Sequence, residues 1–71
     1  MLGQEEIDNF WTDVERRLAK DRPNTTPEDR LRGIIRYRNA LAIGAVNKMV
    51  YHREPDDVAH DIEVGEFVAR R

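Results

Sequence analysis

The sequence contains no cysteine and no serine, and it has only two histidines among its 71 residues. The lack of cysteine excludes disulfide bonds and cysteine-ligated zinc sites. Cysteine and serine are also the commonest nucleophiles of covalent catalysis. The three threonines, Thr12, Thr25 and Thr26, fall near predicted turns or on a polar helix face. We therefore expect that this protein is not an enzyme.

Metal and phosphate sites are not indicated either. The two histidines, His52 and His60, match no zinc-binding spacing. Asp56 and Asp57 follow Pro55 at a predicted helix start, where acidic side chains favour the helix dipole without any metal. The four glycines are scattered and form no phosphate-binding loop. We expect no metal and no cofactor.

Long hydrophobic runs are absent. The longest candidate, residues 40–46, is interrupted by Gly44 and is far shorter than the roughly 18 residues that cross a membrane. The first six residues lack the basic and apolar regions of a signal peptide. A net charge of −2 argues against a general nucleic-acid binder. These features predict a soluble, cytoplasmic protein that does not contact a membrane.

The length leaves room for one domain, residues 1–71. A domain of this size buries only about 60% of the surface that its unfolded chain exposes, so its core is small. Such domains often gain stability from a disulfide, a metal or a partner chain. Because the first two are not expected here, self-association or binding to another protein is the remaining supplement.

The spacing of apolar residues predicts three helices, and the first covers about residues 4–21. One helical face of this segment collects nearly all of its large apolar side chains. Pro23 follows and prevents the helix from continuing. The aromatic pair on this face is predicted to belong to the core. The apolar stripe consists of Ile7, Phe10, Trp11, Val14 and Leu18.

A second, long helix is predicted over about residues 27–53. Thr26 has the side chain of an N-cap, Pro27 suits the first helical position, and Asp29 stands where a capping box places its acid. The Glu54-Pro55 pair marks the predicted end. Arg38 falls at the centre of the main apolar face. That face is predicted to contain Leu31, Ile35, Ala42, Ala45, Val46 and Met49.

A third helix is predicted over about residues 55–69, beginning at Pro55. Residues 62–67 also alternate between apolar and polar types, but a terminal strand would need a partner edge, so a helix is favoured. The expected fold is therefore all-α, with a helical hairpin followed by a C-terminal helix.

Small residues on the far side of the second helix predict a second packing surface. Gly33, Ala40 and Gly44 recur at spacings of seven and four, which would let another helix approach closely, and Tyr51 lies near them. Gly44 could instead mark a kink, because glycine costs about 1 kcal/mol inside a helix. Two further aromatic residues, Tyr37 and Phe67, are candidates for a partner surface.

The charges are unevenly placed along the chain. Residues 1–23 carry a net charge of −2, residues 24–53 carry +4, and residues 54–71 carry −4. The simplest interpretation is that the third helix folds against the second and the charges pair. Alternatively, Arg32 and Arg36 form an anion-binding stripe or an interface. Arg38 could extend to the edge of the apolar face, pair internally, or meet a ligand.

These observations favour a small helical protein–protein interaction module that self-associates, as a homodimer, through its long central helix. One alternative is a small inhibitor or adaptor that binds a larger protein, for example one encoded by a phage or mobile element. Another is an anion, nucleotide or nucleic-acid binder, which is less favoured. Such a binder would use Arg30, Arg32, Arg36 and Arg38.

Overall fold

The structure is a computed structural model that describes residues 3–46 and 49–65. These residues form three α-helices and a short 3₁₀ helix, and they include no strand. The predicted all-α, three-helix fold is confirmed. None of the described helices is long and apolar enough to cross a membrane. The elements are α1 (Gln4–Asp21), α2 (Pro27–Ala42), the 3₁₀ helix η1 (Val50–His52) and α3 (Pro55–Val64).

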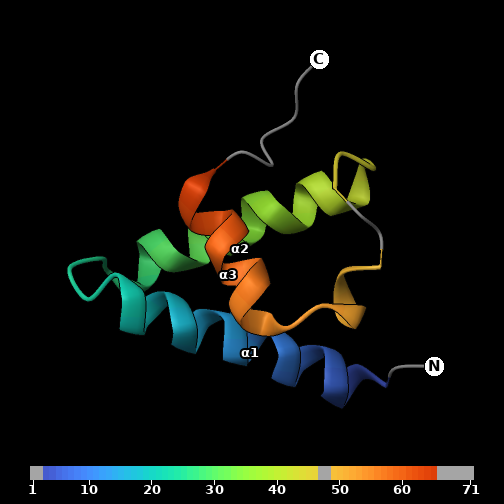
Figure 1. Ribbon diagram of the computed structural model, residues 1–71, viewed down its shortest axis with the longest axis horizontal. Helices are drawn as coiled ribbons and strands as arrows, with labels where there is room; N and C mark the ends of the chain where they lie inside the picture. The colour runs from blue at the N-terminus through green and yellow to red at the C-terminus, as the bar shows by residue number, and fades with distance from the viewer. Residues whose placement is uncertain (1–2, 47–48, 66–71) are drawn as a thin grey trace.

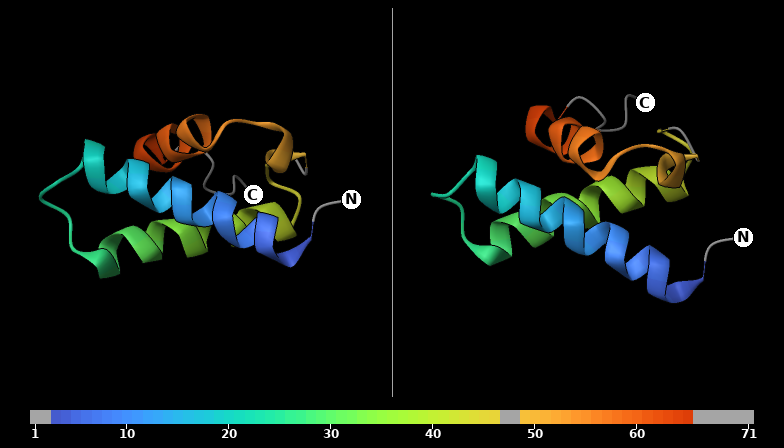
Figure 2. Two further views of the ribbon diagram at one scale, coloured as in Figure 1. Left: turned by 90° about the horizontal axis from the view of Figure 1, so that it is seen from below. Right: turned by 60° about the horizontal axis from the view of Figure 1, so that its bottom comes forward.

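The first two helices run in opposite directions as a hairpin, and α3 lies against one side of it (Figure 1). α3 packs mainly on α1 and touches α2 to a smaller extent. Figure 2 shows the hairpin and α3 from two further directions. The Tyr51 ring of η1 packs edge-on against Phe10 in the N-terminal half of α1, with centroids 5.1 Å apart. The third helix therefore closes the core between the two arms of the hairpin.

The predicted start of α2 is confirmed. The Asp29 amide donates a hydrogen bond of 3.1 Å to Thr26 Oγ1, and the Thr26 amide donates one of 3.4 Å to Asp29 Oδ2. This reciprocal pair is a capping box, which satisfies backbone donors that the first turn leaves without partners. Pro27 and Pro55 occupy the first turns of α2 and α3, as their sequence positions predict.

The second helix ends at Ala42, so the predicted extension to residue 53 is wrong. Gly44 takes a left-handed conformation with φ 80°. Its amide donates to the Leu41 carbonyl at 3.2 Å, and the Ala45 amide donates to the Ala40 carbonyl at 2.8 Å. These two bonds form a Schellman motif, which stops a helix. Gly44 is thus a helix stop rather than a packing residue or a kink.

The third helix ends at Val64, where Gly65 takes φ 69°. A left-handed glycine at this position is a common helix ending. Residues 66–69, which were also predicted to be helical, lie outside the described part of the chain.

The core of the described structure lies between the three helices. The stripe predicted on α1 is confirmed, because its members are buried or packed against the buried cluster. α2 contributes Ile34 and Tyr37 to the core, whereas η1 and α3 contribute valine and alanine side chains. The buried cluster contains Trp11, Val14, Leu18, Ile34, Tyr37, Val50, Val58 and Ala59.

The face of α2 that enters this core differs from the predicted one. Leu31 and Ile35, expected at its centre, are 54% and 48% exposed. The prediction counted apolar residues between positions 45 and 49, which share the face of Leu31 only if the helix continues. Since α2 ends at Ala42, the opposite face carries the larger apolar set, including Ile34 and Tyr37. That opposite face is the one that is buried.

Candidate functional site

One face of α2, with apolar residues in its centre and a charged residue on either side of them, is exposed, although the opposite face of the same helix is in the core. Five exposed residues follow one another at spacings of three, four, three and four: Glu28, Leu31, Ile35, Arg38 and Ala42. With 100° of rotation per residue, they occupy a sector of about 80° on the helix surface. This spacing is the repeat that lines the contact of two packed helices. We call these five residues the α2 stripe.

Arg38 lies at one edge of the α2 stripe and stacks on an aromatic ring of α1. Its guanidinium carbon is 5.1 Å from the centroid of the Trp11 ring, which is a cation–π distance. A stacked guanidinium uses its flat face and leaves its N–H edges able to bind a carboxylate. Among the described residues, no acidic side chain forms an ion pair with Arg38.

Glu28 lies at the other end of the α2 stripe, in the first turn of the helix. Its side chain is exposed, and no basic residue within the described ranges forms an ion pair with it. The α2 stripe therefore has two apolar side chains, Leu31 and Ile35, in its centre, an acid before them and an arginine after them.

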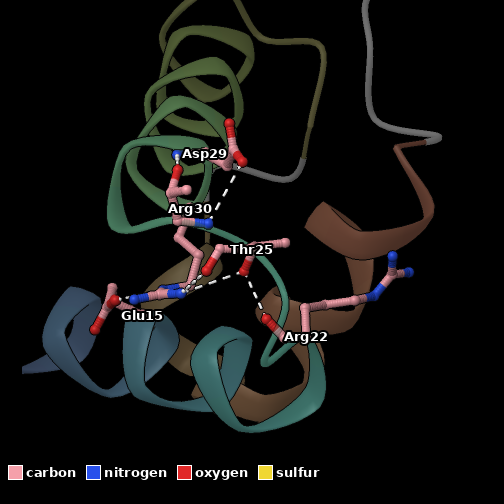
Figure 3. Close-up of polar contacts among 6 residues, drawn as sticks. Glu15, Arg22, Thr25, Asp29 and Arg30 are labelled. Carbon is pink, nitrogen blue, oxygen red and sulfur yellow. Dashed lines mark hydrogen bonds and ion pairs between the residues drawn. The ribbon is translucent and has the colours of Figure 1, made fainter.

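Arg30 points the other way and closes the hairpin. Its Nε donates to Glu15 Oε2 at 2.7 Å, and its Nη1 donates to the Thr25 carbonyl at 2.7 Å and to Thr25 Oγ1 at 3.2 Å. Figure 3 shows this side chain reaching from α2 to α1, with the Thr25 hydroxyl donating in turn to the Arg22 carbonyl. Arg30 thus fixes the turn between α1 and α2.

The arginines suggested as an anion-binding set are therefore divided among different contacts. Arg30 binds within the hairpin, and Arg38 stacks on Trp11. Arg32 lies 3.8 Å from Asp29 on its own helix. Arg36 is exposed on the polar side of α2, about 120° away from the centre of the α2 stripe. Arg30 and Arg38 are thus engaged elsewhere, whereas Arg32 and Arg36 are both exposed one turn apart on α2, so an anion-binding stripe at these two residues stays a prediction.

Three of the residues suggested for helix packing make contacts inside the chain. A Cβ atom on Gly33 would lie only 2.9 Å from Ile62 Cγ2, so α3 packs directly on the Gly33 backbone. Ala40 is buried. The Tyr51 hydroxyl accepts a hydrogen bond from Trp11 Nε1 at 2.9 Å. The small-residue side of α2 therefore faces its own chain, and Gly44 is in the turn that follows the helix.

Tyr37 was expected at a partner surface, and this expectation is wrong. The side chain is 1% exposed because position 37 lies between Ile34 and Ala40 on the buried face. Arg53 Nη1 donates to the Tyr37 hydroxyl at 3.3 Å and to Asp61 Oδ2 at 2.6 Å. Burial raises the pKa of Tyr37. Phe67, the other suggested contact, lies outside the described residues.

The charge segments pair between elements, although not simply between the second and third helices. Arg17 on α1 binds Asp56 on α3 at 2.8 Å. The pairs Arg30–Glu15 and Arg53–Asp61 link α2 to α1 and the end of η1 to α3. Each pair joins two different elements of the fold. Since partly exposed ion pairs contribute little free energy, these pairs orient the helices more than they stabilise them.

Two acidic side chains that sequence reasoning missed lie together where α1 ends beside α3. The Asp21 carboxyl interacts with that of Glu63, and Glu63 Oε2 is buried with no hydrogen-bond partner among the described residues. Burial, followed by the nearby Asp21 carboxyl, raises the pKa of Glu63, whereas the hydrogen bond from Arg17 lowers the pKa of Asp21. No local sequence pattern relates positions 21 and 63, because only the packing of α3 brings them together.

A small hollow lined in part by Glu63 opens between the three helices, with a volume of about 180 Å³. That is below the roughly 300–1,000 Å³ of sites that hold small organic ligands. No group of three or more His, Cys, Asp or Glu side chains in residues 3–46 and 49–65 is placed to hold a metal ion. Comparison with protein-family models, curated proteins and solved structures gives no significant match. The apolar centre of the exposed α2 stripe lies outside the core cluster of the described residues, and the stripe is the feature on which a functional proposal can be built.

Proposed function

We propose that this protein is a small, non-enzymatic protein–protein interaction module that self-associates through the exposed face of α2. The observation that carries the proposal is the position of Leu31 and Ile35. Both are about half exposed in adjacent turns, while the opposite face of α2 is already in the core. A helix on the surface of a small domain normally carries polar side chains on its outer face. Clustered apolar side chains there are typical of a contact site.

The size of the core supports the same proposal. A domain of this length is only thinly stabilised by its own burial. The described residues hold no disulfide or metal-binding group that would supplement the core. Burying Leu31 and Ile35 against another chain would add apolar contact and would stabilise the folded state through mass action. A second copy of the chain is always present at the concentration of the first.

Sedimentation equilibrium of the wild type and of the double variant Leu31→Gln/Ile35→Gln tests the proposal. We expect the wild-type mass to rise towards that of a dimer with increasing concentration, and the variant to remain a monomer with unchanged helical circular dichroism. Val64→Gln is the matched control, because Val64 is 47% exposed on α3 and lies outside the α2 stripe. A wild type that stays monomeric, or a double variant that associates like the wild type, would disprove the proposal.

A further inference from the structure

We infer that the α2 stripe binds α2 of a second copy of this chain in antiparallel orientation, with Glu28 of each copy bound to the partner's Arg38. This inference rests on the proposed function and adds the orientation, the register and the ion pairs of the contact. It is drawn from the order of side chains along the α2 stripe, in which an acid, two large apolar residues and an arginine follow one another.

The spacing of these residues is symmetric. Leu31 and Ile35 are four positions apart, Glu28 precedes Leu31 by three positions, and Arg38 follows Ile35 by three positions. An antiparallel two-fold contact centred at the level of residue 33 therefore places Leu31 opposite the partner's Ile35. The same register places Glu28 opposite the partner's Arg38, at both ends of the contact. With a rise of 1.5 Å per residue, the two ion pairs lie about 15 Å apart along the helix axis.

The charged groups at both ends are available for this contact. Glu28 and Arg38 are exposed and form no ion pair with other described residues. The stack on Trp11 restricts the Arg38 side chain while its N–H edges can still reach a carboxylate. A guanidinium–carboxylate contact of this kind is stronger than a hydrogen bond between neutral groups. The two pairs would also exclude water from the four apolar side chains between them.

Other arrangements of the same two helices fit less well. A parallel two-fold contact places Glu28 opposite the partner's Glu28 and Arg38 opposite the partner's Arg38, and like charges that face each other destabilise a contact. An antiparallel contact shifted by one heptad places Ile35 opposite the partner's Arg38 and leaves Glu28 without a basic group. Only the register centred at residue 33 satisfies the apolar and the charged positions together.

Charge reversal at the two ends of the α2 stripe tests the register. We expect Glu28→Arg alone and Arg38→Glu alone each to raise the dimer dissociation constant at least about tenfold, because each substitution turns two attractive contacts into repulsive ones. An equimolar mixture of the two single variants should form heterodimers, since both ends then pair opposite charges. The double variant Glu28→Arg/Arg38→Glu should form homodimers for the same reason.

Sedimentation equilibrium gives the dissociation constants, and native mass spectrometry identifies the heterodimer in the mixture. Arg36→Glu makes the same charge change on α2 outside the stripe and should alter the dissociation constant little. The Glu28→Arg variant keeps the contact of Arg38 with Trp11. It therefore tests the register even if the Arg38→Glu variant does not fold. Reversals without effect, or a mixture that does not recover association, would overturn the register. If Leu31→Gln/Ile35→Gln still abolished association in that case, the proposed function would stand without it.

Discussion

The indole Nε1 of Trp11 donates a hydrogen bond of 2.9 Å to the hydroxyl of Tyr51. The two side chains come from the middle of α1 and from η1, and the Tyr51 ring also packs edge-on against Phe10 with centroids 5.1 Å apart. This contact ties the segment that follows α2 to the first helix. It explains how the chain can leave α2 early and still return to the core before α3 begins.

Tyr51→Phe should lower the free energy of unfolding by about 1–3 kcal/mol, because Trp11 would keep a donor with no acceptor in a site that is largely closed to water. Trp11 is 7% exposed. Urea unfolding followed by the fluorescence of this single tryptophan measures the loss. Thr12→Ala is the control, since it removes an exposed side-chain hydrogen bond from the same helix. An unchanged unfolding midpoint for Tyr51→Phe would show that the hydrogen bond contributes nothing.

Gly33→Ala should destabilise the fold although alanine favours a helix by about 1 kcal/mol over glycine. The new Cβ would lie 2.9 Å from Ile62 Cγ2, a methyl on a stiff, β-branched side chain, so α3 would have to move. Overpacking of this kind costs about 1–3 kcal/mol. Thermal unfolding of Gly33→Ala measures the effect.

The partner substitution Ile62→Ala shows whether this contact is the cause. We expect Gly33→Ala to be harmless or stabilising when Ile62 is already alanine, because the close contact is then gone. The coupling between the two substitutions should be of the order of 1 kcal/mol, as is usual for side chains in contact. Additive effects of the two substitutions would contradict direct packing of α3 on Gly33.

The elements of this fold that depend on local signals could be predicted from the sequence. The apolar spacing from Ile7 to Leu18 located α1, and the Thr26-Pro27 pair located the start of α2. Each signal acts within a few residues, so its physical cause is contained in a short segment. The buried position of Trp11 follows from the same spacing.

The buried face of α2 could not be predicted in the same way, because it depends on where the helix stops. Gly44 was compatible with a helix interior, a kink or a stop, and the choice among them decides whether Leu31 or Ile34 faces the core. The position of Gly44 is one signal that could have located the stop, since a glycine just after the last apolar residues of a helix is the usual C′ residue. The Asp21–Glu63 contact required the tertiary packing itself.

Substitutions at Gly44 test this helix stop. Gly44→Ala should lower the free energy of unfolding by about 1–2 kcal/mol, because a residue with a Cβ atom pays that cost in the left-handed conformation. The φ angle of Gly44 is 80°. Gly44→Asn should cost less, since asparagine tolerates this conformation better than alanine does. Urea unfolding gives both values. Equal stabilities of the alanine and asparagine variants would contradict a left-handed conformation at this position.

The pair of carboxyl groups at Asp21 and Glu63 should make stability depend on pH. The pKa of Glu63 in the folded protein is raised above its ordinary value of 4.5. The protonated side chain therefore stabilises the fold fully below that pH, and this stabilisation is lost as the pH rises through the folded-state pKa. A glutamine amide can donate to Asp21 at any pH. The gain in unfolding free energy from Glu63→Gln should therefore be larger at pH 7 than at pH 4. Urea unfolding at both values measures it, with Glu5→Gln as the control for loss of one exposed charge, and an equal gain at both would exclude a raised pKa.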